Sequence, residues 1–231
     1  MGKQILFLNG SPKKAHSTSE SICDYLIELL SGKNLQIEKL HIHALLKTKE
    51  GEERMLSAVN QADTIVFSCP LYIDAPPSMV MKAMELIAEH KNQTKVAKKQ
   101  NMLAISNCGF PEAFQNDVAL RIYRKFAQDA GFKWLGGLAF GMGAVTNGKP
   151  MKIMGFVYPR IRKVFNNVAN ALFEEKMIEE EIAALAAQHF IPMRLYTWIG
   201  NTITWRAIAI KNGVWNIYSA PYERKAKKIH A

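Results

Sequence analysis

The 231-residue sequence lacks the patterns that identify membrane spans, metal clusters and common nucleotide loops. Its three cysteines, Cys23, Cys69 and Cys108, form no CxxC pair, so we expect neither a zinc site nor an iron–sulfur cluster. So few and scattered cysteines also favour a reducing, cytoplasmic location. No run of 18 uncharged apolar residues is present, which excludes a typical transmembrane helix.

Acidic residues are scarce in the last part of the chain. The protein carries a net charge of +10, and residues 141–231 contribute +7 of it, with 13 basic against 6 acidic residues. A solvated basic tail is the usual explanation of such an excess. No recognised nucleic-acid motif is present, so we expect no nucleic-acid partner. Peripheral membrane contact through this aromatic and basic region is a less favoured alternative.

What is present is an alternation of strand and helix patterns over the first 140 residues. Short apolar runs predict strands at residues 4–9, 35–42, 64–68, 101–106 and 134–140. Apolar residues at helical spacing predict helices at residues 22–30, 52–62, 78–89 and 112–130. In the last of these helices we expect Val118, Ile122, Phe126 and Ala130 to face inward. Apolar strands alternating with helices indicate an α/β fold whose doubly wound parallel sheet is covered on both faces.

The pattern changes after residue 145. Residues 156–190 look helical, whereas residues 192–222 contain three tryptophans and show no clean period. We therefore expect one domain over residues 1–145 and a helical, aromatic-rich extension over residues 146–231. The extension is expected to pack on the same domain or at a subunit interface.

Three polar loops follow strands whose carboxyl ends should meet at one edge of the sheet, where such folds bind ligands. They cover residues 10–19, 69–78 and 107–112. The first places Ser17, Thr18 and Ser19 at the start of a helix, after Ser11 and Lys13. Hydroxyls at a helix N-terminus suit an anion, with phosphate as the natural occupant. The alternative is a capping box, because Ser17 and Glu20 have S-x-x-E spacing.

The first loop does not fit the best-known nucleotide motifs. It contains neither GxxxxGK[ST] nor GxGxxG, since Gly10 is its only glycine. A phosphoacceptor site would need an acidic residue near the end of the first strand, where Asn9 stands instead. A redox pair between Cys69 and Cys108 is conceivable, although buried cysteines behave mostly as small apolar residues.

The three loops, taken in order, resemble those of the flavodoxin-like NAD(P)H-dependent FMN reductases. Gly10-Ser11-Pro12-Lys13 with Ser17-Thr18 is similar to that family's first loop. Pro70-Leu71-Tyr72, followed by Ser78 and Lys82, is similar to the second loop and its helix. Ser106-Asn107-Cys108-Gly109 occupies the place of the third loop. The resemblance covers roughly residues 3–140.

The resemblance implies a five-stranded sheet in the order 2-1-3-4-5, with FMN bound between strands one and three. On this basis Ser11, Lys13, Ser17, Thr18 and Ser19 would hold the ribityl phosphate. The ring would lie against residues of the second and third loops, namely Pro70, Leu71, Tyr72, Ile73, Asn107, Gly109, Phe110 and Glu112. Hydride transfer itself requires no acid or base from the protein, so we assign no catalytic side chain.

The implied function is an oxidoreductase that accepts hydride from NAD(P)H and reduces a small acceptor such as a quinone, a nitro compound or a flavin. A homodimer is also expected from the family. The alternative is a flavodoxin-type electron carrier that does not oxidise NAD(P)H.

Two departures from the family's patterns matter. Residues 41–53 contain no cysteine, which excludes the cluster of the iron–sulfur flavoproteins, and Ile73 stands where a larger ring is common.

Overall fold

The apolar segments predicted as strands form one parallel sheet. The computed structural model describes residues 2–13, 16–94, 98–146 and 148–218. The strands are β1 (Lys3–Asn9), β2 (Leu35–His41), β3 (Thr64–Pro70), β4 (Gln100–Asn107) and β5 (Phe132–Phe140). They pair in parallel in the order β2-β1-β3-β4-β5. The predicted order is therefore confirmed.

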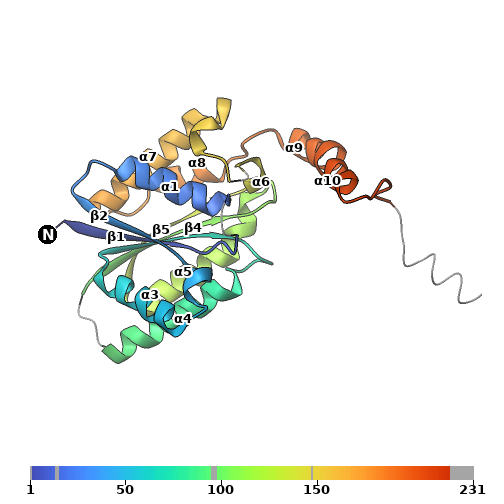
Figure 1. Ribbon diagram of the computed structural model, residues 1–231. Coiled ribbons are helices and arrows are strands. Elements are labelled where there is room, and N and C mark those ends of the chain that lie inside the picture. Colours follow the sequence, from blue (N-terminus) through green and yellow to red (C-terminus); the bar gives the residue numbers. More distant parts are fainter. Residues whose placement is uncertain (1, 14–15, 95–97, 147, 219–231) are drawn as a thin grey trace, which may run out of the picture. The chain divides into compact units, whose positions relative to one another are not determined.

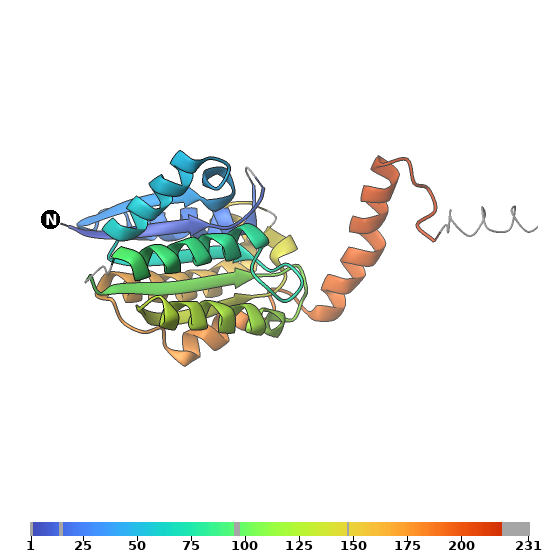
Figure 2. The same cartoon turned by 90° about the horizontal axis from the view of Figure 1, so that it is seen from below.

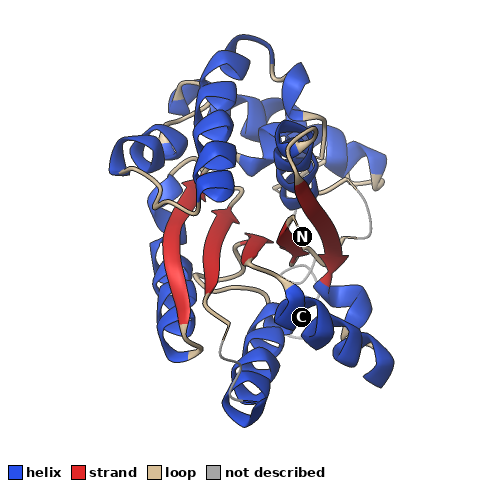
Figure 3. Ribbon diagram, turned by 90° about the vertical axis from the view of Figure 1, so that its left-hand side faces the viewer, coloured by secondary structure: helices blue, strands red, loops and turns tan. Residues whose placement is uncertain are grey.

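Helices cover both faces of the sheet (Figures 1 and 3). On one face lie α1 (Thr18–Leu30), α7 (Tyr158–Glu174) and α8 (Glu180–Ala187). On the other lie α2 (Ile42–Leu45), α3 (Lys49–Gln61), α4 (Ser78–Thr94) and α5 (Asp117–Asp129). This arrangement confirms the doubly wound α/β fold, with helical segments continuing after the last strand.

Alternate side chains of the central strands supply two hydrophobic cores. Leu6, Leu8, Ile65 and Phe67 belong to the core shared with α3, α4 and α5. The Phe67 ring lies 5.6 Å from the ring of Tyr123 on α5. On the opposite face, rings of α1, α7 and β5 meet: Phe165 lies 5.6 Å from Tyr25 and stacks on Phe140 at 5.4 Å. Because helices pack on both faces, a ligand can reach the sheet at the ends of its strands.

The helix predicted from residue 112 begins later than expected, and one of its four expected inward residues is exposed. A 3₁₀ turn, η1 (Ala113–Asn116), comes first, and α5 begins at Asp117. Phe126 and Ala130 are buried as predicted, but Val118 is 41% exposed. Ala119 and Tyr123 are buried instead. The apolar spacing misled because it left out Tyr123, whose ring forms part of the core.

The segment after β5 contains short helical turns before α7. These are α6 (Gly143–Thr146) and two 3₁₀ turns, η2 (Met151–Ile153) and η3 (Gly155–Val157). Contacts divide the chain into two compact units, residues 1–190 and 191–231. The domain boundary expected after residue 145 stays a prediction.

The second unit is helical over residues 193–211. A continuous helix combines α9 (Met193–Ile199), a π-helical segment η4 (Gly200–Thr204) and α10 (Trp205–Lys211), as Figure 2 shows. Trp198, Trp205 and Trp215 are all exposed. Within the part of the chain that the structure describes, no helix is both long and apolar enough to cross a membrane.

Gly10, directly after β1, occupies a position where the structure leaves no space for a side chain. An ideal Cβ there would lie 2.4 Å from Cys69 Sγ and 2.5 Å from Val80 Cγ2. We predict that Gly10→Ala lowers the free energy of unfolding by about 1–3 kcal/mol, as overpacked cores do. Urea unfolding monitored by circular dichroism measures this change.

Gly109→Ala is the matched control for that variant. A Cβ at Gly109 would meet nothing within 4 Å, so we expect a change within about 0.5 kcal/mol of wild type. Equal stability of Gly10→Ala and Gly109→Ala would contradict the close packing of β1 against β3 and α4.

Candidate functional site

The three loops predicted to converge do meet at one cavity. It has a volume of about 270 Å³ and lies at the carboxyl ends of β1, β3 and β4. Its lining residues are Ser11, Lys13, His16, Ser17, Thr18, Ser19, Pro70, Leu71, Tyr72, Asn107, Cys108, Gly109, Gly143 and Ala144. Of the residues predicted from sequence, only Ile73, Phe110 and Glu112 are not part of this lining.

The first loop is shaped by Asn9 at the end of β1. Its Oδ1 accepts a hydrogen bond from the backbone N–H of Ser11 (2.9 Å), and Ser11 Oγ accepts one from the N–H of Lys13 (3.3 Å). The N–H of Gly10 donates to the carbonyl of Ser68 on β3 (3.0 Å). The amide of Asn9 thus turns the chain from the strand into the loop, a role that an amide oxygen performs without adding charge.

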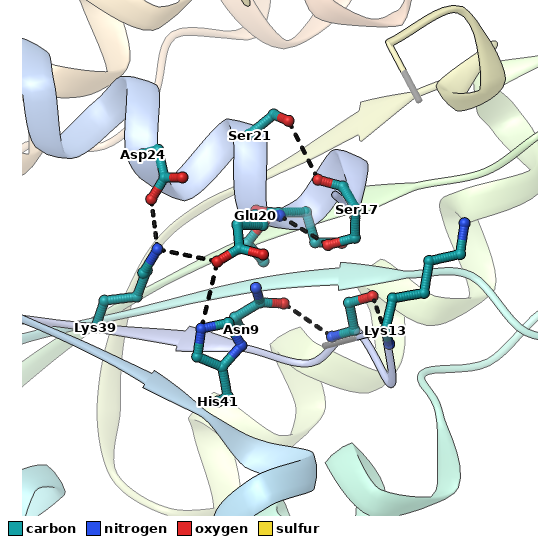
Figure 4. Close-up of polar contacts among 11 residues, drawn as sticks. Asn9, Lys13, Ser17, Glu20, Ser21, Asp24, Lys39 and His41 are labelled. Carbon is teal, nitrogen blue, oxygen red and sulfur yellow. Dashed lines mark hydrogen bonds and ion pairs between the residues drawn. The ribbon is translucent and has the colours of Figure 1, made fainter. Parts of the chain in front are cut away.

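Ser17 caps the helix that begins after this loop. Its Oγ accepts a hydrogen bond from the N–H of Glu20 (3.1 Å). The reciprocal half of a capping box is absent in the described residues, because the Glu20 carboxylate lies against Lys39 and His41 instead (Figure 4). A hydroxyl that accepts one hydrogen bond still has its proton to donate. Capping by Ser17 is therefore compatible with binding an anion.

The other two hydroxyls of this helix start are used differently. Thr18 Oγ1 donates its proton to the carbonyl of Gly143 (2.8 Å). Ser19 Oγ accepts from Asn107 Nδ2 (2.9 Å), so its proton remains available. The backbone N–H groups of the first helical turn have no partner within the helix. Ser17 and Ser19 can thus donate side-chain protons into the cavity, whereas Thr18 can donate from its backbone.

Asn107, at the end of β4, connects all three loops. Its side-chain Nδ2 donates to Ser19 Oγ and to the carbonyl of Cys69 (3.0 Å). Its backbone carbonyl accepts from the N–H of Leu71 (2.8 Å). The side chain is buried. Both N–H groups of its side-chain amide already donate hydrogen bonds within the protein, so Asn107 fixes the positions of its neighbours. Only its Oδ1 remains to accept a further bond.

The second loop contains a tight two-residue turn. Tyr72 and Ala75 exchange backbone hydrogen bonds of 2.9 and 3.2 Å across Ile73 and Asp74. Both turn residues are left-handed, with φ values of 48° and 60°, a conformation that β-branched Ile73 rarely adopts. The turn leaves Tyr72 49% exposed at the cavity and Ile73 98% exposed beyond it. The local conformation therefore explains why Ile73 does not line the cavity.

Two residues of the third loop also lie outside the lining. Phe110 is 58% exposed, and Glu112 is partly buried ahead of η1. Their contact with a ligand stays a prediction. The loop itself is fixed by backbone bonds: the N–H of Met142 donates to the carbonyl of Phe110 (2.6 Å), and that of Gly143 to the carbonyl of Cys108 (2.7 Å).

The sequence interpretation missed the fourth wall of the cavity. Gly143 and Ala144 follow β5, and a Cβ at Gly143 would lie 3.0 Å from the carbonyl oxygen of Cys108. The signal was the pair of glycines at 141 and 143, directly after the predicted fifth strand. His16 of the first loop lines the cavity as well. Gly148 packs on its backbone, since a Cβ at Gly148 would lie 2.1 Å from the carbonyl carbon of His16.

The cysteines near the cavity are not activated. All three of the chain's cysteines are buried and free. Burial raises the pKa of the Cys69 thiol to about 12 and also raises that of Cys108. Protonated thiols are poor nucleophiles, so these side chains act as small apolar residues. In the described segments, His, Cys, Asp and Glu side chains form no group of three that could hold a metal ion.

Comparisons with solved structures reveal similar folds. An FMN-dependent NADH-azoreductase from Bacillus anthracis, in complex with FMN, is 17% identical, with a TM-score of 0.52 over 74% of this chain and 100% of that one. An NADPH-quinone reductase from P. pentosaceus is 18% identical, with a TM-score of 0.53 over 73% and 98%. A flavone reductase is 13% identical, with a TM-score of 0.55 over 98% and 96%. At these identities the likeness establishes the fold.

Sequence comparison identifies the family. A search of curated proteins found no match. A family model described as a flavodoxin-like fold matches residues 3–153, which include all five strands and every loop that lines the cavity. Because this match spans well over half of the sequence, the chain belongs to the family of flavodoxin-like fold proteins.

Proposed function

We propose that the protein is an FMN-dependent oxidoreductase that accepts hydride from NAD(P)H and reduces a small acceptor such as a quinone, a nitro compound or a flavin. The observation that carries the proposal is the cavity, which joins phosphate-type donors of the first loop to an exposed tyrosine of the second. The names of the similar structures, an azoreductase, a quinone reductase and a flavone reductase, support this class of reaction.

The donor set at one end of the cavity fits a phosphate. Ser11, Ser17 and Ser19 each accept a hydrogen bond through Oγ and keep a proton to donate. Lys13 adds a positive charge, and Thr18 would contribute its backbone N–H. Donors of this kind at a helix N-terminus stabilise a dianion through direct bonds and through the helix dipole.

The other end of the cavity fits a flat ring. Pro70, Leu71 and Tyr72 would lie along one side of it, with Asn107 and Gly109 on the other. Bound FMN would supply the hydride-accepting chemistry. The residues of this chain would orient the ring and hold it at an open edge of the sheet, where NAD(P)H and the acceptor can approach. Contacts of the ring with Ile73, Phe110 and Glu112 are a further part of the proposal.

We further propose that the protein is a cytoplasmic homodimer. Large apolar side chains of the loops around the cavity are exposed, including Ile73, Phe110 and Phe114 of η1. A partner subunit that covered them would remove apolar surface from water and would close the flavin site on one side. The scarcity and burial of the cysteines agree with a reducing compartment.

Ser17→Asp separates anion binding from helix capping. Aspartate caps helices as well as serine does, so the capping bond from the Glu20 N–H should be kept and α1 should still form, as circular dichroism would show. FMN should bind more weakly by about 1–3 kcal/mol, because one donor is lost and a negative charge is added. Riboflavin, which has no phosphate, should bind as it does to wild type. Flavin fluorescence titrations measure both affinities, and unchanged FMN affinity would contradict the phosphate site.

NAD(P)H distinguishes the enzyme from the electron carrier. We predict that anaerobic addition of NADH or NADPH to the FMN-loaded protein alone bleaches the flavin absorbance near 450 nm within roughly seconds, because one hydride reduces each bound flavin. A carrier would keep its absorbance until a protein partner is added. The net charge of +10 already disfavours a carrier, since flavodoxin-type carriers are typically acidic.

A further inference from the structure

Glu20 places a negative charge beside the anion site proposed above. It is the third residue of α1, and its N–H is the group that Ser17 caps. Its side chain is only 19% exposed, so water screens the carboxylate incompletely. A charge in this position would repel a phosphate dianion at the same helix end, unless another group compensates it.

The compensation comes from β2. Lys39 Nζ lies 3.2 Å from Glu20 Oε1, and His41 Nε2 lies 3.4 Å from the same oxygen (Figure 4). Residues two apart on a strand point to the same face, which is why both side chains reach α1. Lys39 also contacts Asp24, one turn further along α1, at 2.5 Å. Lys39 thus forms ion pairs with both Glu20 and Asp24, the two carboxylates in the first turns of α1.

The state of Lys39 agrees with this role. Partial burial alone would lower the pKa of Lys39, but its hydrogen bonds to Asp24 and Glu20 raise the pKa above the ordinary value. The lysine is therefore charged throughout the neutral range. The second oxygen of Glu20, Oε2, is buried and has no hydrogen-bond partner in the described residues. Compensation of the Glu20 charge thus depends on the groups of β2 that contact Oε1.

From these contacts we infer that Lys39, with His41 beside it, is a positioning residue that draws the Glu20 carboxylate toward β2 and offsets its charge, so that the start of α1 can accept the phosphate of FMN. This inference rests on the proposed function. The sequence interpretation could not find Lys39, since it lies on the second strand, outside every loop of the site.

Lys39→Met tests the inference, with FMN and riboflavin as the two probes. We expect the Kd for FMN to rise about tenfold, which is the size of effect that charges near a helix N-terminus produce. The Kd for riboflavin should not change, because riboflavin has the same ring without the phosphate. The double variant Lys39→Met/Glu20→Gln should restore FMN affinity to within about twofold of wild type, since the uncompensated charge is removed together with its partner.

A matched control removes an ion pair at the other end of the sheet. Lys98 Nζ lies 2.9 Å from a carboxylate oxygen of Asp63. Asp63 directly precedes β3, at the amino end of the strands. Lys98→Met changes the net charge of the protein by the same amount as Lys39→Met. We expect it to leave the Kd for FMN unchanged, which would show that the effect of Lys39 is local.

The outcomes separate the inference from the proposed function. Wild-type protein that binds neither flavin would overturn both. Wild-type protein that binds FMN, with Lys39→Met binding it equally well, would overturn the inference and leave the function standing. Weakening of FMN and riboflavin alike in Lys39→Met, without rescue by Glu20→Gln, would show a merely structural role and would also overturn the inference.

Discussion

The buried amide of Asn107 is the interaction on which the geometry of the site depends. Parallel strands end at the same edge of a sheet, but their loops are free to diverge unless something joins them. The side-chain amide of Asn107 joins them by donating to Ser19 on α1 and to the carbonyl of Cys69 on β3. Its backbone carbonyl also accepts from the N–H of Leu71. The cavity is lined by the loops that these bonds hold together. Polar contacts at the carboxyl ends of the strands thus fix the positions of the loops that line the cavity.

The hydrogen bonds within the cavity wall decide which groups remain for a ligand. Ser17 and Ser19 accept bonds from the protein and keep their protons, whereas Thr18 spends its proton on Gly143. The nearby carboxylate of Glu20 is turned toward β2. An anion at this helix start would therefore meet donors, while the contact with Lys39 offsets the negative charge of Glu20 beside it.

Much of this organisation could be predicted from the sequence, because it follows from apolar runs and turn residues. The five strands and the meeting of three loops are examples, whereas the order of the strands was implied by the family resemblance. What could not be predicted depends on contacts between distant residues. Tyr123 is buried in place of Val118 because its ring packs against Phe67 of β3, and the exposure of Ile73 depends on a left-handed pair in its turn. Neither feature can be recognised from the spacing of apolar residues in the sequence.

The central claim is that the loop from β1 to α1 binds the phosphate of FMN. A crystal structure of the protein grown with FMN tests it most directly. The account predicts the phosphate within hydrogen-bond distance of Ser17 Oγ and the first backbone N–H groups of α1, with the ring against Tyr72. Flavin bound at any other place, or a phosphate turned away from the start of α1, would contradict it.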